Sequence, residues 1–282
     1  MKVIKSIGKI RKAITQLKKK GKTIGFVPTM GALHEGHLSL VRQSRKENDV
    51  TVVSIFVNPT QFGKNEDFAG YPRPEKKDIK LAKQEKVDII FYPSAVEMYP
   101  NGSLASITVE KITENLCGKF RPGHFKGVAT VVGKLLNIVL PDVMYLGQKD
   151  AQQCVVLKKV VDDLNFPVRI GVCPTAREHD GLAMSSRNAY LTAKQRSEAP
   201  ILFESLKMAK AKILAGERDV TTIRKMIVEN IEKGSSGDVQ YVECVGAGQL
   251  QPLAAIEGKI MIALSVWFGR TRLIDNMIFD VK

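Results

Sequence analysis

The sequence predicts an α/β fold, with a Rossmann-like doubly wound parallel sheet followed by a smaller C-terminal α+β domain. Helical and strand-like patterns alternate along the first part of the chain, which is typical of parallel sheets with helical crossovers. From Thr192 onward the order changes to helices followed by strands, which indicates a separate α+β unit. We therefore expect one domain at residues 1–175 and a second at 176–282.

The first domain is predicted to open with a helix, a strand, a helix and a second strand. Apolar residues at helical spacing indicate a helix over 7–20. The apolar run 24–27 indicates a buried strand, and Pro28 ends it because proline fixes φ and lacks an amide donor. A helix follows at about 34–47. The β-branched run 50–57 is typical of a central parallel strand covered on both faces.

The other elements follow from the same patterns. In the first domain we expect helices at 75–86 and 127–140, a helix starting near 148, and strands at 88–92, 107–109, 142–147 and 168–172. Residues 63–75 are rich in Gly, Asn, Asp and Pro, as in a mobile loop. In the second domain we expect helices at 193–215 and 219–233, then strands at 239–245, 259–266 and 274–280.

Composition limits the class of protein. A net charge of +14 raises nucleic acid as a partner, but the basic residues are dispersed and aromatics make up only 6%. An anionic small substrate accounts for positive potential equally well. No apolar run approaches the length of a membrane span. Four scattered cysteines without a Cys-x-x-Cys pair fit a reducing cytoplasm. We expect a cytoplasmic protein that binds neither nucleic acid nor membrane.

Two histidines open the helix that follows the strand at 24–27. His34 and His37 are three residues apart, so their rings share one helix face. A helix N-terminus favours anions, and imidazoles add donors suited to phosphate. Two alternatives remain open: histidines that merely cap the helix or face water, and a zinc pair. His-Glu-Gly-His is one residue shorter than the His-Glu-x-x-His zinc motif, which disfavours the metal.

Further polar clusters follow strands at the carboxyl edge, where open α/β sheets place their ligands. They comprise Asn58 to Gly63, Gln148 to Gln153 and Arg177 to Asn188. The last cluster holds serines and an arginine suited to gripping phosphate oxygens. Lys149 as a plain surface charge, and 177–188 as an ordinary linker, remain alternatives at this point.

Five separated motifs carry a family resemblance. They are PTMGALHEGH at 28–37, FVNPTQF at 56–62, RPGHF at 121–125, GQKDAQQ at 147–153 and DGLAMSSRN at 180–188. The His-x-Gly-His stretch resembles the nucleotide-binding motif of the nucleotidylyltransferase superfamily. Together the motifs resemble the pantothenate synthetase (pantoate–β-alanine ligase) family over essentially the whole chain. The resemblance implies ATP-dependent condensation of pantoate with β-alanine through pantoyl adenylate, releasing AMP and pyrophosphate, in vitamin B5 and coenzyme A biosynthesis.

The resemblance also implies site residues. Those expected to be catalytic are His34, His37, Lys149 and Arg187. Those expected to bind ATP are Met30, His34, His37, Gly147, Lys149, Asp150, Met184, Ser185, Ser186 and Arg187. Those expected to bind pantoate are Met30, Asn58, Gln61, Arg121 and Gln153. Members of the family use Mg²⁺ with ATP, and Asp78 is the implied ligand. They are homodimers, so we expect a homodimer here.

Two positions depart from the family pattern. Gln148 stands where many relatives carry glutamate, and Thr60 replaces an apolar residue common in the motif. Two rival functions fit the sequence less well. Another nucleotidylyltransferase would usually need the nucleotide domain alone, and a basic nucleic-acid-binding module would need clustered basic and aromatic residues.

Overall fold

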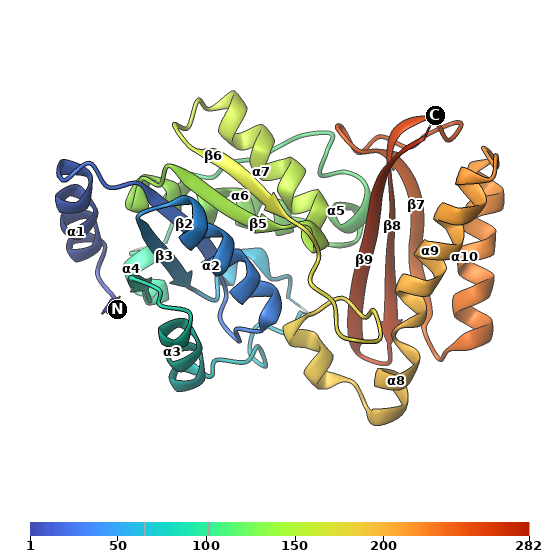
Figure 1. The fold of residues 1–282 in the computed structure, drawn as a ribbon, viewed down its shortest axis with the longest axis horizontal. Helices are drawn as coiled ribbons and strands as arrows, with labels where there is room; N and C mark the ends of the chain where they lie inside the picture. Colours follow the sequence, from blue (N-terminus) through green and yellow to red (C-terminus); the bar gives the residue numbers. More distant parts are fainter. Residues whose placement is uncertain (65, 101, 282) are drawn as a thin grey trace. The chain divides into compact units, whose positions relative to one another are not determined.

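The chain, in a computed structural model that describes residues 1–64, 66–100 and 102–281, divides into two compact units (Figure 1). Unit 1 comprises Met1–Glu110, Arg121–Gln148 and Val156–Pro174. Unit 2 comprises Lys111–Phe120, Lys149–Val155 and the chain from Thr175 onward. Residue 65, within the predicted loop at 63–75, lies outside the described residues.

Unit 1 is built on a parallel sheet, as the sequence predicts; it has six strands, of which the short β1 was not predicted. In spatial order these are β1 (Lys2–Ile4), β4 (Ile89–Phe91), β3 (Val50–Ile55), β2 (Ile24–Thr29), β5 (Val143–Gly147) and β6 (Arg169–Cys173). Every residue of β3 is buried, which explains its nearly continuous β-branched sequence. The carboxyl ends of β2 and β3 are in register, Thr29 beside Ile55, so the polar segments after them start at the same edge.

Helices cover both faces of this sheet (Figure 1). They are α1 (Ile7–Lys19), α2 (Glu35–Glu47), α3 (Glu75–Gln84), α4 (Ala95–Met98) and α6 (His124–Val139), with the 3₁₀ turn η1 (Pro59–Gln61) after β3. α2 packs Leu40 and Val41 against Val27 and Val53 of the sheet. The 3₁₀ turn η2 (Gln148–Asp150) follows β5 and leads into α7 (Ala151–Asp163), whose residues are divided between the units.

Unit 2 has an antiparallel sheet of β7 (Asp238–Gly246), β8 (Gly258–Phe268) and β9 (Thr271–Val281). Its helices are α5 (Leu116–Phe120), α8 (Ala193–Glu198), α9 (Ile201–Leu214) and α10 (Val220–Gly234), with the 3₁₀ turn η3 (Ser186–Tyr190). One face of the sheet shares a core with α9 and α10, formed by apolar residues such as Leu206, Ile227 and Leu264. The smaller α+β unit is therefore as predicted.

Two predicted elements are wrong in detail. Residues 107–109 form no strand, because the amide of Ile107 donates to the Thr130 hydroxyl of α6 instead of to a neighbouring strand. The single helix expected at 193–215 is two helices, and the break coincides with Pro200, which has no amide donor. Among the described residues, none of the helices has both the length and the apolar character needed to cross a bilayer.

Candidate active site

The start of α2 is held by its own two histidines. The amide of Gly36 donates to Nδ1 of His34 at 3.1 Å, and the amide of His34 donates to Nδ1 of His37 at 3.4 Å. The two rings lie close together, with centroids 4.1 Å apart. The rings lie together as predicted, but not as neighbours on one helix face: His34 is the extended N-cap residue just before α2, and the two side chains cap the helix reciprocally.

This capping fixes how each imidazole carries its proton. Because Nδ1 of both His34 and His37 accepts a main-chain amide, the ring proton of each neutral imidazole resides on Nε2. Each ring therefore directs an Nε2–H donor away from the helix backbone. A pair of such donors at a helix N-terminus suits an anionic group such as phosphate.

The turn before α2 is closed by a buried carboxylate from α3. Asp78 is 1% exposed and accepts the amides of Ala32 at 2.9 Å and Leu33 at 2.8 Å. Burial raises the pKa of the Asp78 carboxyl, and these two amide hydrogen bonds oppose the rise. Gly31 has φ +83°, and a Cβ there would approach Asp78 Oδ2 to 2.9 Å. The close approach of Asp78 to the turn thus needs glycine at 31.

The surroundings of Asp78 do not fit a Mg²⁺ site. Both of its oxygens already accept main-chain amides, and the side chain is buried in protein. In the part of the chain that the structure describes, no group of three or more His, Cys, Asp and Glu side chains is arranged to hold a metal ion. Asp78 is a structural support for the histidine-bearing turn.

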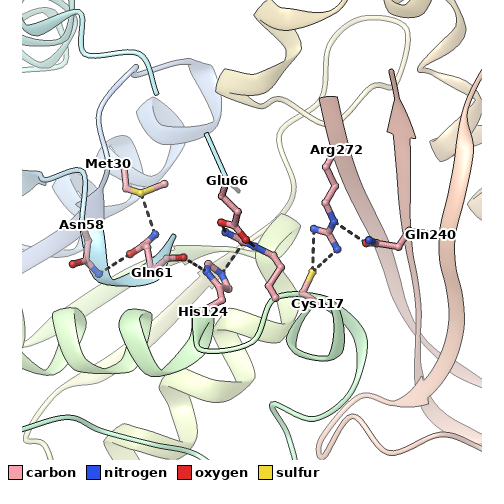
Figure 2. Close-up of polar contacts among 9 residues, drawn as sticks. Met30, Asn58, Gln61, Glu66, Cys117, His124, Gln240 and Arg272 are labelled. Carbon is pink, nitrogen blue, oxygen red and sulfur yellow. Dashed lines mark hydrogen bonds and ion pairs between the residues drawn. The ribbon is translucent and has the colours of Figure 1, made fainter. Parts of the chain in front are cut away.

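The predicted pantoate residues of unit 1 form a connected set at η1 (Figure 2). Gln61, 8% exposed, donates from Nε2 to the Met30 sulfur at 3.0 Å and accepts from Asn58 Nδ2 at 3.1 Å. Asn58 in turn accepts from the hydroxyls of Thr60 at 3.0 Å and Tyr99 at 2.9 Å. The departure at Thr60 therefore has a structural role, since its hydroxyl helps to orient Asn58.

α6 supports this turn through its main chain. A Cβ at Gly127 would come within 2.3 Å of the Thr60 carbonyl oxygen, so η1 lies directly against the backbone of α6. The Gly127 carbonyl also accepts from Asn58 Nδ2 at 3.2 Å. Gln61 is thus held by both side-chain and main-chain contacts.

A series of polar contacts connects the Gln61 carbonyl with Glu66 in the following loop (Figure 2). Arg121 forms a two-pronged ion pair with Glu66, with Nε to Oε1 at 2.7 Å, and its Nη1 contacts Nε2 of His124 at 3.0 Å. Guanidinium groups only donate, so Nε2 accepts, and Nδ1 of the neutral ring donates to the Gln61 carbonyl at 2.9 Å. Burial raises the pKa of Glu66, but the hydrogen bond and charge of Arg121 outweigh it, leaving that pKa below its usual value.

The loop carrying Glu66 is also packed by its own rings. Phe62 contacts Phe68 and Tyr71, with ring centroids 5.3 Å and 5.8 Å apart. Arg73 donates to the carbonyls of Phe68 and Tyr71, each at 2.9 Å. The loop therefore folds on itself, and among the ion pairs described for it the Glu66–Arg121 pair alone ties it to the segment that leads into α6.

In unit 2, Lys149 and Asp150 occupy η2, where β5 ends and α7 begins. Lys149 is largely buried, with 19% of its side chain exposed, and its Nζ lies 3.9 Å from Asp150 Oδ1. A lysine with that little exposure is not a plain surface charge. Gln153 lies in the first turn of α7 and is half-buried.

The predicted phosphate loop of unit 2 follows a short hairpin. Arg177 and Ala183 form an antiparallel bridge, and the amide of Met184 donates to the Ala176 carbonyl at 2.9 Å. Ser185 then caps η3, accepting the Arg187 amide at 3.2 Å. Met184 to Arg187 are all half-buried on this turn.

The predicted residues thus divide by unit. Unit 1 holds Met30, His34, His37, Asn58, Gln61, Arg121 and Gly147, and unit 2 holds Lys149, Asp150, Gln153, Met184, Ser185, Ser186 and Arg187. Sequence reasoning missed the supporting residues Tyr99, Asp275 and Asn276, and it placed His124 and Arg177 in motifs without assigning them a supporting role. A signal existed for Asp275 and Asn276, because they interrupt an apolar strand with adjacent polar residues.

Comparison with known proteins identifies the family. The family model described as pantoate-beta-alanine ligase matches residues 2–278. The chain is 53% identical over 281 residues to the pantothenate synthetase of Caldicellulosiruptor saccharolyticus and 54% identical over 281 residues to that of Acetivibrio thermocellus, covering 100% of each chain.

Solved structures agree. The pantothenate synthetase of Thermus thermophilus superposes with a TM-score of 0.93 at 39% identity, covering 98% of this chain and 99% of that one. The pantoate-beta-alanine ligase of Francisella tularensis, complexed with beta-gamma ATP and beta-alanine, gives 0.83 at 38% identity, covering 99% and 97%. The chain therefore belongs to the pantoate–β-alanine ligase family of enzymes.

Proposed function

We propose that this chain condenses pantoate with β-alanine in two steps that use ATP as a substrate. In the first step a pantoate carboxylate oxygen attacks the α-phosphorus of ATP, the bond to the β-phosphate breaks, and pyrophosphate leaves. In the second step the β-alanine amine attacks the acyl carbon of pantoyl adenylate, loses a proton, and displaces AMP. The products are pantothenate, AMP and pyrophosphate.

The observation that carries the proposal is the histidine pair of α2, whose Nδ1 atoms both accept main-chain amides. The pair is thereby fixed as two neutral donors, His34 and His37, that we assign to the ATP phosphates. A pantoate carboxylate is already ionised at neutral pH, so the first step needs positioning and charge stabilisation more than a general base. Donors fixed before the substrate arrives cost no reorganisation during reaction.

Cationic and hydroxyl groups are assigned to the rest of the triphosphate. Lys149 would neutralise charge at the transferring α-phosphate, while Ser185, Ser186 and Arg187 would bind the β- and γ-phosphates. Gly147 and Asp150 would help place the ribose, and Met184 would line the nucleotide site. These assignments follow the family motifs residue by residue.

Amides are assigned to pantoate. Gln61 and Gln153 would hold its hydroxyls and carboxylate, because an amide both donates and accepts. Met30 would line the same cavity, with Asn58 and Arg121 at its border. The contact of Gln61 with Met30, 3.0 Å between Nε2 and sulfur, supports placing these two residues in one site.

We further propose that Mg²⁺ is needed together with ATP, although Asp78 does not fit as a ligand for it. We also propose that the enzyme works in the cytoplasm as a homodimer, with domains 1–175 and 176–282. Mg²⁺ and the homodimer follow from the family resemblance, the cytoplasm from the scattered cysteines, and the domain bounds from the change of pattern along the chain.

Pantoate-dependent exchange of labelled pyrophosphate into ATP, measured on the purified protein without β-alanine, tests the function. We expect exchange that requires pantoate and Mg²⁺, because adenylate formation is reversible. A protein that binds ATP but shows no exchange would require a different acceptor than pantoate.

A further inference from the structure

Strand β9 carries two adjacent buried polar residues that the proposed function does not use. Asp275 is 3% exposed and Asn276 is 4% exposed. Residues next to each other on a strand point to opposite faces of the sheet. Asp275 shares its face with Leu273 and Phe279, which lie in the core beside α9 and α10, so Asn276 points to the other face. Burying polar groups costs free energy unless they are hydrogen-bonded.

On one face, Asn276 holds the main chain at Lys149. Its Nδ2 donates to the Lys149 carbonyl oxygen at 2.9 Å, across 127 residues of sequence. The carbonyl lies in η2, the turn from which the Lys149 side chain projects. This hydrogen bond therefore fixes the main chain from which the Lys149 side chain projects. The ammonium group then reaches the site from a fixed starting position.

On the other face, Asp275 holds the hairpin that leads into the phosphate loop. Its carboxylate takes both prongs of the Arg177 guanidinium, at 2.6 Å and 3.0 Å, and only 2% of the Asp275 side chain is exposed. Arg177 Nη1 also donates to the Gly181 carbonyl at 3.0 Å, and its guanidinium lies 3.6 Å from the centre of the Phe203 ring. A planar fork held on three sides fixes the hairpin in orientation as well as in position.

Hydrogen bonds of Asn188 connect the hairpin to the phosphate loop at 184–187. Asn188 Nδ2 donates to the Ala183 carbonyl at 3.1 Å, and the Asn188 amide donates to the Ser185 carbonyl at 3.1 Å. Ser185, Ser186 and Arg187 are therefore linked through short contacts to the segment that Arg177 and Asp275 hold.

We infer that Asp275 and Asn276 are positioning residues for adenylation, and that strand β9 sets the spacing between Lys149 and the 184–187 loop. This inference rests on the proposed function, which assigns Lys149 to the α-phosphate and the loop to the β- and γ-phosphates. Bond making at one phosphorus and departure of pyrophosphate need both groups at a fixed separation. A misplacement of about 1 Å costs on the order of 100-fold in rate.

The two residues predict different kinetic defects. Asn276→Ala frees the Lys149 turn, so kcat of pantoate-dependent exchange should fall by about 10- to 100-fold while ATP affinity stays within about twofold. Asp275→Asn loosens the phosphate loop, so ATP affinity should fall by about tenfold, whereas affinity for AMP, which lacks the β- and γ-phosphates, should stay within about twofold. Calorimetric titration with ATP and with AMP measures these affinities.

Matched variants separate positioning from general damage. Asn230→Ala removes a comparable amide in the same unit, one that donates to the Ser205 hydroxyl at 2.9 Å, and Asp280→Asn removes an exposed carboxylate from β9 itself. Both should keep wild-type exchange and affinities. Arg177→Lys keeps the charge but loses the two-pronged ion pair, so it should show the same loss of ATP affinity as Asp275→Asn. It takes the place of Asp275→Asn in the test if Asp275→Asn folds poorly.

A double variant tests the route of action. Because Asn276 acts through Lys149, Asn276→Ala should cause no further loss of single-turnover rate in a Lys149→Ala background. An added loss there, wild-type kcat in folded Asn276→Ala, or equal loss of ATP and AMP affinity in Asp275→Asn, would overturn the inference. Absence of pantoate-dependent exchange in the wild-type protein would overturn the proposed function instead, and the ATP-against-AMP comparison would still decide the role of Asp275.

Discussion

Two arginine–carboxylate forks each hold a polar segment, and they differ in burial. In unit 1, Arg121 pairs with Glu66 of the loop after η1, with 16% and 24% of the side chains exposed. In unit 2, Arg177 pairs with Asp275, with 18% and 2% exposed. A carboxylate that reaches water loses little when its partner leaves, whereas a buried carboxylate left alone is costly. We therefore expect the arginine–carboxylate ion pair of unit 1 to open more easily than that of unit 2.

We propose that this difference matches two roles: the loop after η1 closes over the acyl adenylate, and the 184–187 loop holds the phosphates. A loop that closes over a hydrolysis-prone acyl adenylate must also open for substrates, so a releasable contact suits it. A loop that holds phosphates during reaction gains from rigidity, because fixed donors need no reorganisation. The following predictions test the comparison, from the largest expected effect to the smallest.

Lys149→Ala sets the upper limit of what loosening the Asn276 contact in unit 2 can cost, since Lys149 is the group at the reacting phosphorus in the proposed reaction. We expect pantoate-dependent exchange to fall by about 10³-fold with the fold intact, because a preorganised charge at the transition state is lost. Lys158→Ala, which removes an exposed lysine from the following helix α7, should keep normal exchange. Near-normal turnover in Lys149→Ala would remove its proposed role.

Breaking each fork with an isosteric amide compares them directly. Asp275→Asn should lower the free energy of unfolding by about 3 kcal/mol, because it breaks an ion pair whose carboxylate is only 2% exposed. Glu66→Gln should cost at most about 1 kcal/mol, since the Glu66 carboxylate is more accessible to water, with 24% of its side chain exposed. Urea denaturation of both variants measures the two values. Equal losses would show that burial does not distinguish the forks.

The histidine pair is held in a third way, by hydrogen bonds from main-chain amides. His34→Asn keeps a good N-cap residue but loses the imidazole donor, whereas His34→Ala loses both. We expect both variants to lose about 10²-fold in exchange. Only His34→Ala should also lose about 1 kcal/mol of stability. If His34→Asn were fully active, capping alone would explain the histidine.

The smallest effect is the pH dependence of the unit 1 fork. The Glu66 pKa lies below its usual 4.5 in the folded protein, so the ionised form stabilises the fold. This contribution is fully present above about pH 4.5 and is lost as pH falls through the lower, folded pKa. The stability difference between wild type and Glu66→Gln should therefore shrink on acidification. A difference that stays constant between neutral pH and about pH 3 would exclude this linkage.

The sequence predicted much of the fold because periodicity and proline or glycine punctuation act locally. The apolar run of β3 and the helical spacing of α2 each reflect contacts that one face of an element must make. The strand expected at 107–109 failed because a side chain from α6, Thr130, took the amide that a neighbouring strand would have used. Such a partner is decided by tertiary packing.

The candidate site shows the same difference between features that local sequence predicts and features that tertiary packing decides. The spacing of His34 and His37 predicts that their rings lie together, but their reciprocal capping through both Nδ1 atoms depends on the extended main chain of His34 at the helix start. Asn276 reaches Lys149 across 127 residues, and no local pattern encodes that pairing. The two buried polar residues in β9 indicated that a partner exists, but not which one.

Unit 2 draws its residues from three stretches, at 111–120, 149–155 and from 175 onward. A ribosome delivers the first two long before β9 emerges as the last strand. Until then Leu116 and Cys117, buried in the finished protein, are without their sheet, and the Lys149 carbonyl lacks the Asn276 amide. The contacts that we infer to set the spacing between Lys149 and the 184–187 loop therefore form only once β9 is in place. A chain truncated before β9 would keep all five sequence motifs but would lack these contacts.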